Sequence, residues 1–143
     1  PMQFISELDH RGGRKVAVGP HGSVTPAATL RKLQVDIVVL GECEDALVEL
    51  ASDPAGQIAG TASLIDGSLA LHGQSRATDM AKLPALVWED EIIHRHGHHH
   101  HRFDREPTGP GAEVEASRGC PYHCSFCAKM DYRDAYRRRN LNV

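Results

Sequence analysis

The feature that most constrains the fold is a pair of short apolar runs, Lys15 to Val18 and Asp36 to Leu40, each of which leads into a turn and then a helix-like segment. Both runs are too short to be helices, and the second shows no polar alternation, which is typical of a strand buried on both faces. Between them, Thr25-Pro26 supplies an N-cap and a first helical position. After them, Ala46 to Ala51 is amphipathic. This alternation predicts an α/β fold with two parallel strands joined by a helical crossover.

Two parallel strands do not make a self-sufficient core. The segment therefore either docks on something else or forms the second half of a larger, Rossmann-like doubly wound domain. In either case some apolar side chains are expected to lack neighbouring strands, namely Val16, Val18, Ile37 and Val39. An unpaired edge with exposed apolar surface invites self-association and marginal stability.

The remaining segments give shorter signals. Asp66-Gly67, between the strand-like runs Thr61 to Ile65 and Ser68 to His72, is a strong β-hairpin signal. Residues 73–112 are linker-like. Four further expectations concern local structure: a short helix over residues 1–11, a glycine-rich turn over Gly19 to Ser23, a strand over Glu113 to Ala116 and a polar helix over Asp131 to Arg139.

Composition excludes several classes of function. The formal net charge is −3, so the chain lacks the basic surface that duplex nucleic acid requires. No apolar run approaches the ~20 residues of a membrane span, and no secretory signal is visible. We therefore expect a cytoplasmic protein that binds neither nucleic acid nor membranes.

Three of the four cysteines lie within eight residues, as Cys120, Cys124 and Cys127. A disulfide-rich secreted domain would spread its cysteines, so this grouping indicates metal or cluster chemistry in a reducing compartment. Soft thiolates suit iron–sulfur clusters and zinc, and three ligands leave one metal position open for a substrate or cofactor. The alternative is a structural zinc site, with Cys43, His123 or a histidine of the His94–His101 tract as fourth ligand.

The C-x3-C-x2-C loop resembles that of the radical S-adenosylmethionine enzymes, which usually carry an aromatic residue before the last cysteine, here Phe126. Ser117-Arg118-Gly119 and Pro121-Tyr122 also resemble that family. The resemblance implies a 4Fe–4S cluster on the three cysteines, with S-adenosylmethionine on its open iron and reductive cleavage to a 5′-deoxyadenosyl radical. It further implies that Phe126 lies against the adenine, that Tyr122 contributes to the cofactor site, and that a flavodoxin or ferredoxin supplies electrons. The strand at Glu113 and the helix at Asp131 would open the partial (β/α) radical barrel.

The N-terminal half is similar to the cobalamin-binding domain that precedes the radical domain in one large branch of that family. The likeness rests on Gly19-Pro20-His21 after the first strand and on Gly41-Glu42-Cys43-Glu44 after the second, and it implies cobalamin contacts at Gly19, His21, Gly41 and Glu42. Cys43 stands where the family usually has Gly. The expected organisation is the second half of a cobalamin domain (residues 1–55), a hairpin and His-rich connector (56–112) and the start of the radical domain (113–143). The chain would then be the middle piece of a cobalamin-dependent radical enzyme, with possible methyl transfer as its reaction.

Two further sequence features have competing interpretations. Six histidines lie between His94 and His101, which is consistent with a solvated linker, with adventitious metal binding or with a functional metal site. The basic stretch that contains Arg133, Arg137, Arg138 and Arg139 suggests a solvated helix face or a contact with an anionic cofactor. The non-enzymatic alternative for the whole chain is a small zinc-stabilised binding module.

Overall fold

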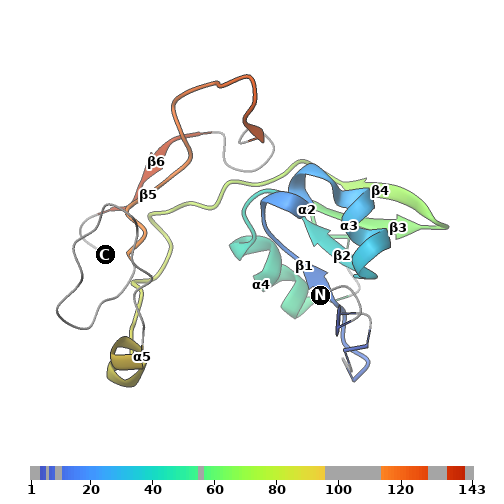
Figure 1. Cartoon of the computed structure of the whole chain (residues 1–143), viewed down its shortest axis with the longest axis horizontal. Coiled ribbons are helices and arrows are strands. Elements are labelled where there is room, and N and C mark those ends of the chain that lie inside the picture. The colour runs from blue at the N-terminus through green and yellow to red at the C-terminus, as the bar shows by residue number, and fades with distance from the viewer. Residues whose placement is uncertain are drawn as a thin grey trace.

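The computed structural model of the chain describes residues 4–5, 7–8, 11–54, 57–95, 114–128 and 135–140, and the structural statements below refer to these residues. The elements follow one another in the order β1 (Val16–Ala17), α2 (Pro20–Val24), α3 (Pro26–Leu33), β2 (Ile37–Val39), α4 (Glu44–Ser52), β3 (Thr61–Ile65), β4 (Ser68–His72), α5 (Asp90–Arg95), β5 (Ser117–Arg118) and β6 (Arg137–Arg138) (Figure 1).

The fold is mixed α/β, built on a four-stranded sheet with the strand order β1-β2-β3-β4. Strands β1 and β2 are parallel, with Val16 opposite Ile37, so the predicted parallel pair is confirmed. The predicted hairpin is confirmed as well, because β3 and β4 pair antiparallel around Asp66 and Gly67, whose φ angles are 50° and 76°. Two consecutive positive φ angles are typical of the tight turn that Asp-Gly favours.

The hairpin also completes the sheet, because β3 pairs antiparallel with β2. The expectation that Ile37 and Val39 lack neighbouring strands is therefore wrong. Strand β2 has a partner on each side, and Ile37, Val38 and Val39 are at most 3% exposed. Burial of β2 on both faces was predicted and is confirmed. Val18 is 48% exposed, so apolar surface remains at the edge of the sheet next to β1.

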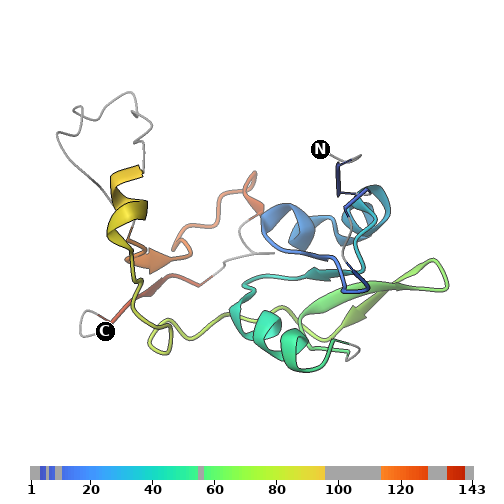
Figure 2. The ribbon, with the colours of Figure 1, turned by 90° about the horizontal axis from the view of Figure 1, so that it is seen from below.

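Helices cover both faces of the sheet, with α2 and α3 on one side and α4 on the other (Figure 2). On the α3 side, Leu30 packs with Val38 and Ala62. On the α4 side, Ala46 and Leu50 pack with Ile37 and Val39. The core is thus formed by alternate residues of β2 facing opposite helical layers, as the strand period requires.

The segment predicted as a glycine-rich turn is helical instead, because α2 begins directly at Pro20 after Gly19, whose φ is 104°. Proline at the first helical position favours this start. Gly22 then lies against β2, where a Cβ atom would come within 2.9 Å of Val38 Cγ1. The glycine thus permits close helix–strand packing.

The C-terminal segment differs from expectation in two places. The strand lies at Ser117–Arg118 rather than before Ser117, and β6 occupies Arg137–Arg138, where a helix was predicted. The two strands pair antiparallel, so residues 137–138 pair with β5 instead of forming a helix. Glu113 and residues 131–134 lie outside the described residues, as does most of the expected helix over 1–11. No helix among the described residues is long and apolar enough to cross a membrane.

Candidate functional site

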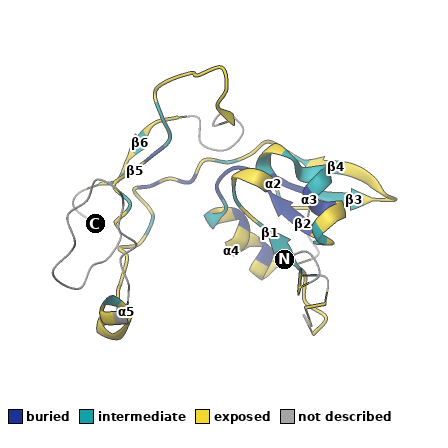
Figure 3. Ribbon diagram, viewed as in Figure 1, coloured by how far each residue is buried: buried dark blue, intermediate teal, exposed yellow. Residues whose placement is uncertain are grey.

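The cysteine loop, residues 119–136, leaves β5 and returns to β6. All three clustered cysteines lie in it. Cys120 is half-buried, whereas Cys124 and Cys127 are exposed, and the Cys127 N–H donates to the Cys124 carbonyl at 3.1 Å. The described part of the loop is largely exposed (Figure 3). Because β5 and β6 pair at its two ends, the loop is closed at its base.

Gly119 accounts for how the base of the loop closes. Its φ is 80°, and a Cβ atom built there would lie 2.1 Å from the Ala135 carbonyl oxygen. A separation under 3.0 Å requires the backbone to move. The residue that directly precedes Cys120 must therefore be glycine for the two ends of the loop to approach this closely.

The thiols have suitable chemistry for a metal centre, but the structure does not gather them into one. All four cysteines are among the described residues, and none is in a disulfide. No group of three or more His, Cys, Asp or Glu side chains in the described part of the chain is arranged to hold a metal ion. The three soft donors on one loop fit an iron–sulfur cluster or zinc by type, and binding either one requires the loop to draw its thiols inward.

Cys43, a candidate fourth ligand, has a structural environment. It stands at the N-cap of α4 and packs against the core cluster of Ile37, Val39, Ala46 and Leu50. This packing is enough to explain why a small side chain stands at this position, and no metal is needed to explain it. Since no described group of three candidate ligands forms, Cys43 is not assembled with the loop cysteines.

Below the cysteine loop lies a group of charged side chains that we call the arginine–glutamate cluster, comprising Glu42, Glu44, Glu115, Arg118 and Arg137. Glu42 and Glu44 come from the turn between β2 and α4 and its junction with the helix. Arg118 and Arg137 come from β5 and β6, where they are opposite each other in the ladder. The cluster thus joins the four-stranded sheet to the base of the loop.

Glu42 is the most buried acid of the cluster, with 1% of its side chain exposed. Arg137 donates to both of its oxygens, from Nη1 at 3.0 Å and from Nη2 at 2.5 Å. The Thr78 N–H donates to Glu42 Oε2 at 2.6 Å. A buried carboxylate needs such partners, because burial without them disfavours its charged form.

Arg118, whose side chain is 6% exposed, is held by three acids. Its Nη2 donates to Glu44 Oε1 at 2.5 Å, and its Nε and Nη2 form a fork with Glu115 at 2.8 and 2.7 Å. Its Nη1 lies 3.6 Å from Glu42 Oε2 and is buried with no hydrogen-bond partner among the described residues. Glu42 is therefore near both guanidinium groups, bonded to Arg137 and electrostatically close to Arg118.

These contacts hold the cluster in its ionised form. Burial raises the pKa of Glu42, but hydrogen bonds from Arg137 and Thr78 and the charges of both arginines outweigh it and lower the pKa overall. For Glu44 burial again acts upward, and the Arg118 hydrogen bond is the main reason that its pKa falls to about 2. The pKa values of Arg118 and Arg137 are raised, chiefly by hydrogen bonds to Glu115 and Glu42 respectively.

The predicted cobalamin contacts divide into two pairs. Gly41 and Glu42 lie at the cluster. Gly41 has a φ of 76° and forms a β-bridge with Arg76, and a Cβ atom built on Gly41 would come within 3.0 Å of the Arg76 carbonyl oxygen. Gly19 precedes α2, and His21 is exposed. Ser23 links the two turns, because its Oγ donates to the Gly19 carbonyl at 3.0 Å and accepts from the Gly41 N–H at 2.9 Å. The carboxyl ends of β1 and β2 thus meet at one edge, as parallel strands require.

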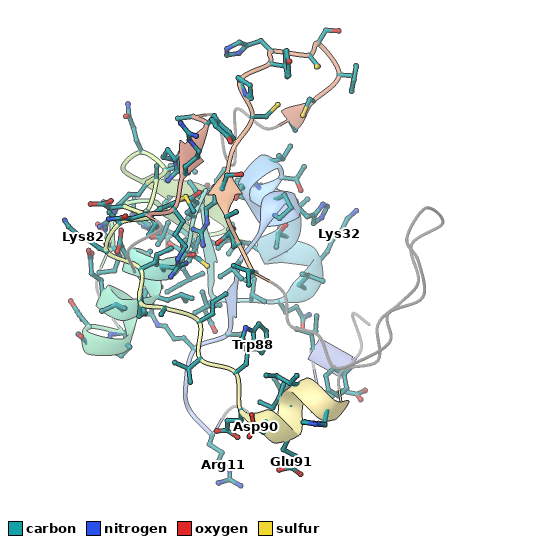
Figure 4. All side chains as sticks on the ribbon, turned by 90° about the vertical axis from the view of Figure 1, so that its left-hand side faces the viewer. Arg11, Lys32, Lys82, Trp88, Asp90 and Glu91 are labelled. Carbon is teal, nitrogen blue, oxygen red and sulfur yellow. The ribbon has the colours of Figure 1, made fainter. Side chains whose placement is uncertain are left out.

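Other predicted site residues lie on exposed surface. Tyr122 is 71% exposed and Phe126 90% exposed, so both aromatic rings are accessible to a ligand at the loop. Of the histidine tract, His94 belongs to α5, where its Nδ1 is 2.7 Å from the Asp90 carbonyl oxygen. Figure 4 shows Asp90 and Glu91 at the start of that helix, following the segment that carries Trp88. Residues 96–101 lie outside the described part.

Sequence reasoning missed the arginine–glutamate cluster. The basic stretch was expected to be a solvated helix face, but Arg137 is bound to Glu42, and Arg139 donates to the Leu83 and Pro84 carbonyls. Only Arg138 of these three is exposed. The alternation of Arg137 and Arg139 around Arg138 fits a strand, but so short a stretch does not distinguish a strand from a helix. No protein-family model matches the chain, and a search of curated proteins returns no match.

Proposed function

We propose that Cys120, Cys124 and Cys127 bind a 4Fe–4S cluster, and that the chain belongs to a cobalamin-dependent radical S-adenosylmethionine enzyme. The observation that supports this most is the placement of three thiols, spaced C-x3-C-x2-C, in one loop whose ends are closed by β5 and β6. Three thiolates leave one iron open to a small chelating ligand. When bound, the cluster supplies the electron that cleaves the sulfonium of S-adenosylmethionine.

The residues of the loop have distinct roles in this proposal. The three thiolates would hold the cluster, and its fourth iron would be open to a ligand. Phe126, almost fully exposed, offers an apolar ring for the adenine, and Tyr122 extends that surface. A flavodoxin or ferredoxin would supply electrons at the same exposed loop. These assignments rest on the family resemblance together with the exposure of the two rings.

The proposed cobalamin contacts lie at the turns after β1 and β2. Ser23 ties these turns together at one edge of the sheet, where Gly19 is half-buried and Gly41 is buried. Ligands of doubly wound domains bind at the carboxyl ends of parallel strands. Since the Glu42 carboxylate is engaged by Arg137, its contribution there would be through the backbone and through its hold on the loop.

The test is anaerobic reconstitution with iron and sulfide. Replacing any one of the three loop cysteines with Ala should abolish iron retention, whereas Cys43→Ala, the matched control, should leave it intact because Cys43 packs in the core. A brown protein with broad visible absorption supports the cluster. A colourless protein that retains one zinc would favour the zinc-stabilised module instead, and equal loss of iron in Cys43→Ala would favour a four-cysteine site.

A further inference from the structure

We propose that the arginine–glutamate cluster positions the cysteine loop, with Glu42 as the shared counter-ion of the two arginines at the base of that loop. The expected effect on cluster retention rests on the proposed function. The effect on the position of the loop does not, and it depends on contacts among the described residues alone. Glu42 is thereby assigned as a positioning residue that acts through Arg118 and Arg137 and does not touch the metal.

The two arginines lie at the base of the cysteine loop. Arg118 lies two residues before Cys120, and Arg137 is its partner across the β5–β6 ladder. Together they form the last pair below the loop. Any movement of this pair relative to the four-stranded sheet therefore moves both ends of the cysteine loop.

The four-stranded sheet holds this pair through one turn. Arg137 binds Glu42, and Arg118 binds Glu44, both from the segment that follows β2. A further link is the hydrogen bond from Arg137 Nη1 to the Thr78 carbonyl at 2.6 Å. The ladder itself contains only two residue pairs, which is too few to position a loop on its own.

Glu42 lies near both arginines: Arg137 is bonded to it, whereas Arg118 is bonded to Glu44 and Glu115 and has Glu42 as a further counter-charge. The two guanidinium groups repel each other, and the Glu42 carboxylate lies 2.5 Å from Arg137 Nη2 and 3.6 Å from Arg118 Nη1. Within the described part of the chain, Arg118 Nη1 is buried with no hydrogen-bond partner and has the Glu42 carboxylate 3.6 Å away. Neutralising Glu42 leaves Arg137 without its buried anion and removes a counter-charge from Arg118, so we expect β5–β6 to separate from the sheet.

The test compares Glu42→Gln with Glu49→Gln in the full chain. Glu49 is the matched control because it also pairs with an arginine through two hydrogen bonds, to Arg76 at 2.6 and 2.7 Å, but lies on exposed surface away from the loop. Amide hydrogen exchange of β5 and β6 is measured first, in the metal-free protein. We expect at least about tenfold faster exchange in Glu42→Gln, with exchange in β2 and β3 unchanged, because supporting contacts govern local opening.

Reconstitution then tests the consequence for the metal. In Glu42→Gln we expect iron to be lost to a chelator about tenfold faster, which is within the range for residues that support ligands. We also expect the electron paramagnetic resonance signal with S-adenosylmethionine to broaden. Unchanged exchange in a folded Glu42→Gln protein would overturn the inference. If Glu42→Gln unfolds β2 and β3 as well, Arg137→Gln decides, since it removes the same contact from the loop side. Failure of the wild type to take up iron would refute the proposed function, whereas the exchange result tests positioning separately.

Discussion

Acidification should weaken the arginine–glutamate cluster through Glu44. The pKa of this carboxyl is lowered from 4.5 to about 2 in the folded protein, chiefly because Arg118 donates to it at 2.5 Å against the opposing effect of burial. A depressed carboxyl pKa gives stability that is fully present above the unfolded value of 4.5. That stability is lost as the pH falls from 4.5 toward 2.

The magnitude follows from the size of the shift. A full shift from 4.5 to about 2 corresponds to roughly 3.4 kcal/mol, at about 1.36 kcal/mol for each pKa unit. The Glu44 side chain is 31% exposed, so solvent screens part of this interaction. We therefore expect Glu44 to contribute about 2 kcal/mol to the free energy of unfolding near neutral pH.

Urea unfolding followed by circular dichroism, repeated from about pH 7 to about pH 2.5, measures this contribution. Glu44→Gln should be less stable than the wild type near neutral pH. The difference should shrink below pH 4.5, because the carboxyl is then protonated in the unfolded chain, and only a small part should remain at about pH 2.5, close to the folded-state pKa of about 2. Glu49→Gln serves as the control, since its exposed pair with Arg76 contributes little to stability. A Glu44→Gln protein that keeps the whole wild-type pH dependence would refute the reasoning.

Three further predictions concern the loop, the histidine tract and cobalamin. Gly119→Ala should prevent iron uptake, because its Cβ would meet the Ala135 carbonyl, whereas Gly67→Ala, with a similar φ and open space, should cost only about 1 kcal/mol of stability and leave iron uptake unchanged; equal iron uptake by both variants would contradict this. Replacing His98 to His101 with Ser should remove nickel or zinc binding without changing reconstituted iron and sulfide, and a parallel loss of iron would show a role in the cluster site. Hydroxocobalamin should bind weakly or not at all when titrated into the isolated chain, because the two turns supply one side of a site; tight one-to-one binding by a monomer on gel filtration would contradict this.

The α/β segment was largely predictable, because its signals are local. β-branched residues in β2, Thr25-Pro26 before α3 and Asp-Gly in the hairpin each specify structure within a few residues. Pairing of β3 with β2 was not predictable in the same way. It joins residues far apart in the chain, and the sequence of either strand is compatible with several neighbours.

The cysteine spacing identified the candidate site, but its supporting residues escaped prediction for a physical reason. Strands of two residues show almost no periodicity, so Arg137–Arg138 within a polar stretch was equally compatible with a helix. Glu42 and Arg137 are 95 residues apart, and only the folded sheet brings them together. Because this partner is so distant in the chain, the pairing of Glu42 with Arg137 could not be predicted. The family resemblance suggested a cobalamin contact at Glu42 instead.

The register of β5 and β6 depends on directional contacts, which a buried ion-pair cluster provides and an apolar contact does not. Buried salt bridges often add little net stability, yet removing one partner is costly, so they discriminate strongly between arrangements. In the observed register Arg137 and Arg139 turn toward Glu42 and the Leu83 carbonyl, while Arg138 is exposed. A slip of one residue would reverse these faces and leave one arginine inward instead of two. A ladder of two pairs cannot specify its own register, and we infer that the directional bonds of the arginines fix the position of the strands on either side of the cysteine loop.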